Sequence, residues 1–398
     1  MVRIALIGSI QVFEIVTTPT GTYTQMISGV GLVLTWVGAV QTHVAPTSGQ
    51  RAATTPFHAF TRNLKNARRT GSTMRDLTDA EYLAELEPIA ADALNQHLSR
   101  TVHWYPHDYI PWDQGSNYAA MGGKDWDPEQ SQLSELAKAA MITNLLTEDN
   151  LPSYHREAMT HLTLDSAWGT WVNRWTAEEN RHGIAIRDYL VVARGVDPVT
   201  LERARMEHVT NGFAPTTEEE EAIGTSVLMA IVYPTFQELA TRVSHRNTGK
   251  VCDDTLALRL LQRVAADENL HMIFYRQMSA AALDLAPDQT LHSIASVIEN
   301  FRMPGTGMPN FRRYGVMMAK HGIYDPRQHL EEVVLPPLRQ WKIFERTDFT
   351  ARGEQRREEL AAYLEKMEQQ AVKFEEQRDR LLAREAARQE ELQSSSVG

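Results

Sequence analysis

The chain has 398 residues, 42% of them hydrophobic, and a formal net charge of −11 at pH 7. This length and composition suffice for a large core in one or two domains, and the negative charge argues against a nucleic-acid-binding protein. The single cysteine, Cys252, excludes an intramolecular disulfide and fits a reducing, cytoplasmic compartment.

Residues 1–73 differ in composition from the rest of the chain. No charged residue occurs between Glu14 and Arg51, and the apolar run 26–40 is about 15 residues long, short of the roughly 20 that a membrane-spanning helix needs. A signal peptide would have basic residues shortly before that run. We therefore expect a disordered extension, or translation from an upstream start with Met74 as the working start. A membrane tether is the less favoured alternative.

From residue 74 onward the periodicity predicts an all-α domain that extends to residue 350. Helices are expected at roughly 131–160, 166–194, 217–246 and 252–284, with an irregular aromatic connection at 103–127 and shorter helices at 285–350. Pro152 lacks an N–H for the carbonyl of Glu148, which predicts a kink or break there. The sequence R-N-T-G at 246–249 predicts another break. Residues 351–398 are charged and amphipathic, typical of one long helix without chemistry of its own.

Two copies of the motif Glu-x-x-His occur in this domain, at Glu179 with His182 and at Glu268 with His271. Positions i and i+3 share one face of a helix, so each motif points a carboxylate and an imidazole the same way. A further Glu precedes each motif: Glu148 by 31 residues and Glu238 by 30. The halves of this internal repeat are offset by 90, 89 and 89 residues.

Such a series predicts a ferritin-like four-helix bundle that holds two metal ions. Four Glu and two His from four helices are the ligand set of di-iron and di-manganese carboxylate bundles. Four carboxylates in an apolar core would be too costly without two divalent cations to offset their charge. Mixed carboxylate and imidazole ligands suit iron or manganese, and the absence of thiolates argues against zinc and iron–sulfur sites. A single Glu-x-x-His is common on helix surfaces, but here both copies are in register with an upstream Glu.

The chain resembles the soluble acyl-[acyl carrier protein] desaturases, ferritin-like di-iron enzymes, and is nearest their actinobacterial branch. The resemblance covers about residues 74–349. It is carried by T-E-D-N-L-P-S-Y-H from Thr147, W-T-A-E-E-N-R-H-G from Trp175, F-Q-E-L-A-T-R-V-S-H-R-N-T from Phe236 and A-D-E-N-L-H from Ala266. It implies an O2-dependent oxidoreductase of fatty acid biosynthesis that introduces a cis double bond into a saturated acyl chain.

The resemblance also implies roles for individual residues. The iron ligands that it implies are Glu148, Glu179, His182, Glu238, Glu268 and His271. Thr241 shares the face of Glu238 and would lie on the oxygen-binding side of the centre, although a Thr that bonds a helix carbonyl has the same spacing. Trp104, Trp175 and Asp267 match positions in a hydrogen-bonded layer behind the ligands, which ligating His residues generally need.

The implied partners are an acyl-acyl carrier protein substrate, a ferredoxin-like electron donor and a second copy of the chain in a homodimer; membrane association is not expected. Leu270 stands where plant members have a basic residue that meets the acidic carrier. The candidates to replace it are Arg302, Arg312, Arg313 and Lys320. No G-x-G-x-x-G motif for a flavin or nicotinamide occurs.

Three alternatives remain open at this stage. The first is another di-iron oxygenase or a radical protein, which would need a Tyr near the centre; Tyr154 lies six residues after Glu148, a poor helical placement. The second is an iron store, which the long segments after the bundle do not suit. The third is an inactive homologue that binds iron or acyl carriers. The chain length of the substrate and the position of its double bond do not follow from the sequence.

Overall fold

The computed structural model describes residues 12–18, 21–27, 76–212 and 227–396, except for 304, 306, 307 and 309. The chain divides into two compact units, Met1–Asn63 and Leu64–Gly398. In the first unit, β1 (Val12–Thr18) pairs antiparallel with β2 (Gly21–Ile27). The rest of the segment 1–73 lies outside the described residues, so its assignment as an extension stays a prediction.

The second unit contains helices and no strand among its described residues, which confirms the all-α prediction. Its helices are α2 (Asp79–Arg100), α3 (Glu135–Asp149), α4 (Leu151–His161), α5 (Ser166–Val192), α6 (Pro198–Asn211), α8 (Val227–Val251), α9 (Thr255–Leu285), α10 (Pro287–Glu299), α11 (Phe311–Lys320), α12 (Pro326–Gln328), the π-helical turn η5 (His329–Val334), α13 (Leu335–Gln340) and α14 (Ala351–Ser396). Four short 3₁₀ turns, η1 (Pro106–Tyr109), η2 (Trp112–Gln114), η3 (Ala119–Met121) and η4 (Pro128–Gln130), form the irregular connection after α2. None of the helices in the described ranges is both long and apolar enough to cross a bilayer.

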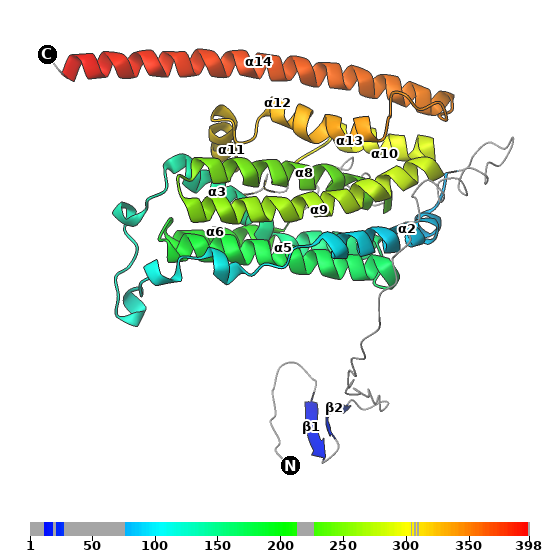
Figure 1. Ribbon diagram of the computed structural model, residues 1–398, viewed down its shortest axis with the longest axis horizontal. Coiled ribbons are helices and arrows are strands. Elements are labelled where there is room, and N and C mark those ends of the chain that lie inside the picture. The colour runs from blue at the N-terminus through cyan, green and yellow to red at the C-terminus, as the bar shows by residue number, and fades with distance from the viewer. Residues whose placement is uncertain are drawn as a thin grey trace, which may run out of the picture. The chain divides into compact units, whose positions relative to one another are not determined.

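Four helices form the centre of the unit: α3 contacts α5 and α8, and α9 contacts the same two helices from the other side. Figure 1 shows these four running side by side, and α2 packs against α5 and α9. Side-chain caps fix where several helices begin. The Asp254 carboxylate accepts hydrogen bonds from the first turn of α9, and Thr78 and Glu81 form a capping box at the start of α2.

The helical structure is interrupted between α3 and α4, directly after Glu148, the first predicted ligand. α3 ends at Asp149 and α4 begins at Leu151, with Pro152 in its first turn, where a missing N–H costs no helical hydrogen bond. This is the break expected from Pro152.

The break expected at 246–249 is wrong, because α8 continues through these residues to Val251. Gly249 has another reason to be glycine. A Cβ atom there would lie 3.3 Å from the Cα of Leu258 on α9, so the missing side chain lets the two helices approach closely.

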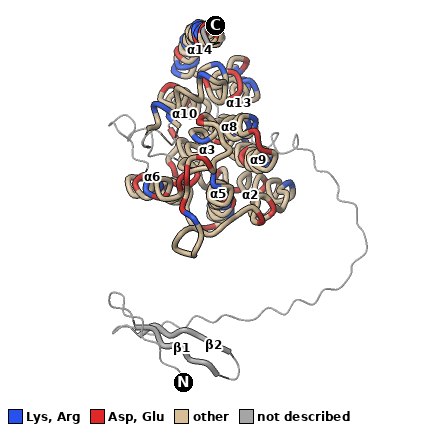
Figure 2. The backbone as a smooth tube through the Cα atoms, turned by 90° about the vertical axis from the view of Figure 1, so that its left-hand side faces the viewer, with Lys and Arg blue, Asp and Glu red and all other residues tan. Residues whose placement is uncertain are grey.

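The C-terminal helix α14 packs along the outside of α10, α12 and η5. Figure 2 shows α14 end-on at the outer edge of the unit, beyond α13 and α10. Leu360 and Ala371 are fully buried there. Arg327 pairs with Glu375, and Arg378 of α14 pairs with Asp325. These contacts make the first half of α14 part of the folded unit.

Candidate metal centre

The structure brings all six predicted ligands together in the middle of the bundle. Glu148 comes from α3, Glu179 and His182 from α5, Glu238 from α8, and Glu268 and His271 from α9. All six residues are at most 7% exposed. They form two groups whose ligand atoms lie within 4.8 Å of one another: Glu148, Glu179, His182 and Glu268 in one, and Glu179, Glu238, Glu268 and His271 in the other. Glu179 and Glu268 belong to both groups and so lie between two candidate metal positions.

In each group the imidazole turns its Nδ1 atom toward the carboxylates. His182 Nδ1 lies 3.6 Å from Glu148 Oε2, 3.5 Å from Glu179 Oε2 and 3.2 Å from Glu268 Oε1. His271 Nδ1 lies 2.8 Å from Glu179 Oε1 and 3.4 Å from Glu238 Oε2. The repeat in the sequence therefore corresponds to two similar ligand sets that face each other.

Several of these ligand atoms are buried and make no well-aligned hydrogen bond to a described residue, although His271 Nδ1 and Glu179 Oε1 lie 2.8 Å apart. The atoms are Glu179 Oε1, His182 Nδ1, Glu238 Oε2, Glu268 Oε1 and His271 Nδ1. Buried polar atoms are normally satisfied, and unsatisfied ones point to an ion or a functional role. Their concentration on the facing sides of the two groups fits two divalent cations, which carboxylate and imidazole donors would hold.

The electrostatics of the centre favour protonation of two of its carboxylates and of its imidazoles. Burial and the neighbouring Glu179 raise the pKa of Glu148 to about 8. Burial, Glu179 and Glu268 raise the pKa of Glu238 well above its ordinary value. Burial alone would lower the pKa of His182, but the carboxylates around it raise that pKa well above the ordinary value. Protons on these groups would reduce the repulsion among the carboxylates, as bound cations would.

Each candidate ligand His presents its other nitrogen, Nε2, to a buried acid on the opposite helix. His182 Nε2 lies 3.4 Å from Asp267 Oδ2 of α9. The same oxygen accepts from Trp104 Nε1 at 2.7 Å and from Arg181 at 2.8 Å, and Arg263 bonds the other oxygen. Burial alone would raise the pKa of Asp267, but its bonds from His182 and Trp104 and the charge of Arg263 lower it. Asp267 is therefore a carboxylate that holds Nδ1 of His182 toward the centre.

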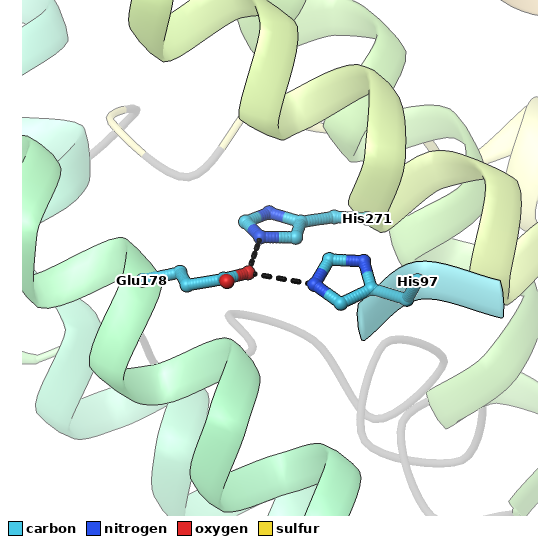
Figure 3. A group of neighbouring side chains, drawn as sticks. All are labelled: His97, Glu178 and His271. Carbon is cyan, nitrogen blue, oxygen red and sulfur yellow. Dashed lines mark hydrogen bonds and ion pairs between the residues drawn. The ribbon is translucent and has the colours of Figure 1, made fainter. Parts of the chain in front are cut away.

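His271 has an equivalent partner that the sequence prediction missed, Glu178 of α5. His271 Nε2 lies 3.0 Å from Glu178 Oε2, and His97 Nε2 of α2 lies 2.9 Å from the same oxygen (Figure 3). Arg174 donates to the other Glu178 oxygen at 2.6 Å. His97, Glu178 and His271 could themselves be taken for a metal site. However, both imidazoles already bond the one Glu178 oxygen, and Nδ1 of His271 faces the main centre. We interpret the trio as support for His271.

The remaining predicted residues also contact the candidate ligands. Trp175 Nε1 donates to Glu238 Oε1 at 3.0 Å. The Thr241 hydroxyl lies 3.1 Å from the Glu238 carbonyl and 3.0 Å from Glu268 Oε2, so it contacts both the helix backbone and the ligand set. His245, which the sequence prediction did not include, lies with its Nε2 2.7 Å from Glu148 Oε1. Burial lowers the pKa of His245 to about 4, so its ring is neutral at neutral pH.

Replacement of the two supporting acids should weaken different metal positions. Asp267→Asn removes the charge behind His182, and Glu178→Gln does the same behind His271; an amide can also favour the wrong imidazole tautomer. Loss of such partners typically lowers metal affinity by roughly 10–100-fold. We expect each variant to retain one tight ferrous site and one weakened site in anaerobic titrations. Asp188→Asn, which alters an acid on α5 paired with Arg187, is the control. Two wild-type sites in both variants would contradict the role of these acids.

The comparisons with known proteins agree with this geometry. The fatty acid desaturase family model matches residues 78–393 and so includes most of α14. DesA1 of Mycobacterium tuberculosis (strain ATCC 25618 / H37Rv), whose name provisionally assigns it as an acyl-[acyl-carrier-protein] desaturase, is 55% identical over 311 residues, or 78% of this chain and 92% of DesA1. A stearoyl-[acyl-carrier-protein] 9-desaturase of Oryza sativa subsp. indica is 27% identical over 322 residues, or 73% of this chain and 77% of the rice protein.

A solved structure shows the same fold. The X-ray structure of DesA2 from Mycobacterium tuberculosis H37Rv matches with a TM-score of 0.52 and 31% identity, over 66% of this chain and 99% of DesA2. The buried Glu and His clusters of the present chain are of the kind typical of di-iron sites in this family. The chain therefore belongs to the acyl-[acyl-carrier-protein] desaturase family.

Proposed function

We propose that this protein is an acyl-[acyl carrier protein] desaturase that introduces a cis double bond into a saturated fatty-acyl chain, with O2 as oxidant and electrons from a ferredoxin-like donor. We further propose that it works as a cytoplasmic homodimer. The observation that carries the proposal is the pair of facing, buried ligand sets with unsatisfied donor atoms in a chain of this family. Two iron ions, when bound there, would supply the activation of dioxygen that no side chain can provide.

The side chains around the centre would position the substrate, exclude bulk water and provide a proton-bearing group. A cavity of about 70 Å³ reaches Thr241 and His245 beside the ligands. Its lining includes Met303, Phe311 and Met318, side chains that suit an alkyl chain, together with polar residues such as Thr143 and Asn144. Because the Thr241 hydroxyl touches both this cavity and Glu268, we assign it the task of holding a proton between substrate and centre.

Helix α11 is the proposed contact for the acidic carrier. It forms one wall of the cavity through Phe311 and Gly315 and presents Arg312 and Arg313 to solvent. Lys320, the third candidate on this helix, pairs with Glu385 of α14 at 2.6 Å and is less available. Two exposed guanidinium groups beside the cavity would attract an acidic partner and orient its acyl chain.

The proposal is tested by mass spectrometry of the acyl chain after incubation of iron-loaded protein with stearoyl-carrier protein, ferredoxin, a reductant and O2. We expect a product that has lost two hydrogen atoms, only when every component is present, and fragmentation then places the double bond. Iron-free protein is the control. Gain of an oxygen atom would favour the oxygenase alternative. Unchanged chains of every length tested, with iron bound, would overturn the desaturase proposal.

A further inference from the structure

The far end of α14 is held to the rest of the unit differently from its beginning. Leu360, Met367 and Ala371 are buried, whereas every residue from 379 to 393, a segment termed the strap, is exposed. Figure 1 shows this end of the helix running past α11. Glu385 joins the strap to the body, because both of its carboxylate oxygens lie 2.6 Å from Lys320 Nζ of α11. Ion pairs that are open to solvent contribute little to stability, so the strap is easily displaced.

Lys320 belongs to a cationic face on α11. Arg313, Val316 and Lys320 are spaced three and four residues apart, so they share one face of the helix, and Arg312 lies four residues before Val316. Arg312 and Arg313 are exposed, and Val316 is 64% exposed. An exposed apolar side chain among three cations suits an acidic protein that also makes apolar contacts. In the free protein, however, Glu385 already neutralises one of these three cations.

We propose that the strap is autoinhibitory: Glu385 holds Lys320 in the free protein, and the acidic carrier must displace it to dock on α11. The inference rests on the proposed function, which assigns α11 as the contact for the carrier. Glu385 and an acidic group of the carrier compete for the same ammonium group. Because Glu385 is part of the same chain, it competes at a high effective concentration. The strap therefore lowers the affinity for acidic partners and discriminates against those that bind the rest of the face weakly.

Removal of the competing charge tests the proposal directly. In Glu385→Gln the strap no longer neutralises Lys320, so we expect stearoyl-carrier protein to bind about threefold more tightly and its KM to fall by a similar factor, with kcat unchanged. Glu376→Gln is the matched control, because Glu376 lies on the same helix and pairs with Arg380 of α14. This control should bind the carrier as the wild type does. Fluorescence anisotropy of labelled carrier at several salt concentrations measures the affinity, and the gain should shrink as the salt concentration increases.

A double-mutant cycle assigns the gain to Lys320 rather than to the general loss of a negative charge. In the Lys320→Met background Glu385 has no ammonium group to neutralise, so Glu385→Gln should leave the affinity for the carrier unchanged. A threefold gain in that background as well would show that Glu385 acts through the overall electrostatic field, and the proposed competition would be wrong.

Hydrogen exchange follows the strap without turnover. We expect addition of stearoyl-carrier protein to slow amide exchange in α11 and to speed it in residues 379–393, because a displaced helix end loses its contact with the body. Slower exchange in the strap would mean that α14 forms part of the docking surface, which overturns the autoinhibitory role.

These measurements separate the inference from the proposed function. If the carrier binds but no acyl chain is desaturated, the proposed reaction is wrong, and the binding data still decide the role of the strap. If the wild type desaturates the substrate and Glu385→Gln binds the carrier no more tightly than the wild type does, the strap is not a competitor. If the carrier does not bind at all, both proposals fail.

Discussion

Replacement of Glu268 by Ala is expected to remove both irons from the protein, whereas replacement of Glu148 by Ala removes about one. Glu268 and Glu179 belong to both ligand groups, but Glu148 and Glu238 each belong to one. A carboxylate shared by two cations offsets charge on both, so its loss weakens both positions together. Iron per chain, measured after anaerobic loading and removal of loosely bound metal, checks the expectation. Desaturation should fall below detection in the Glu268→Ala variant.

The glutamates that hold the equivalent places in the other half of the repeat control this experiment. Glu238→Ala should resemble Glu148→Ala, because the two Glu residues hold equivalent places in the repeat. Glu179→Ala should resemble Glu268→Ala for the same reason. Equal iron loss in all four variants would show that the ligands act as one cooperative set, and the distinction between shared and unshared carboxylates would be wrong.

The metal-free protein is expected to lose stability as the pH rises from about 6.5 to about 8, while the iron-loaded protein changes much less. Below about 6.5 the lowered pKa of His245 acts in the opposite direction, because the unfolded histidine there binds a proton that the buried ring does not. Burial and Glu179 raise the pKa of Glu148 from 4.5 to about 8, and burial, Glu179 and Glu268 raise the pKa of Glu238 well above its ordinary value. A group whose pKa is raised by folding stabilises the fold below its unfolded pKa, and that contribution is lost as the pH rises through the folded pKa. His182 and His271, whose pKa values are also raised, act in the same direction at higher pH.

The size of this effect follows from the pKa shifts. One pKa unit corresponds to about 1.4 kcal/mol, so the free energy of unfolding of the metal-free protein should fall by a few kcal/mol across this range. Thermal unfolding of the iron-free and iron-loaded forms at several pH values measures the gap, which should widen with pH. In iron-free Glu148→Gln, where that site no longer titrates, the fall should be shallower. A pH-independent gap would contradict the assignment.

The cluster of six candidate ligands could be predicted from the sequence because its geometry is local. Two residues three apart on a helix must share a face, so each Glu-x-x-His motif defines half of a site without knowledge of the fold. The apolar helical stretches around Glu148 and Glu238 identified these two residues as the remaining candidate ligands. Long-range packing then only had to bring four helices together.

Two of the supporting residues, His97 and Glu178, could not be found in the same way. His97 reaches Glu178 across 81 residues of sequence, and nothing near His97 distinguishes it from other histidines. One signal for Glu178 was present: an acid precedes the ligand Glu in both motifs, as Glu178 before Glu179 and as Asp267 before Glu268. The break wrongly expected at Gly249 has a similar cause, because its close contact with Leu258 depends on how α8 and α9 pack.

Each Glu-x-x-His motif is supported by residues next to the other motif, and this mutual dependence bears on how the centre arose. The imidazole of each motif is held by the acid of the other, and each ligand group contains a carboxylate from the other half of the chain. Neither helical hairpin could bind a metal ion in this way by itself. A chain of half this length would complete the centre only by pairing with an identical copy, so the duplication that the repeat indicates would have joined two hairpins that already depended on each other.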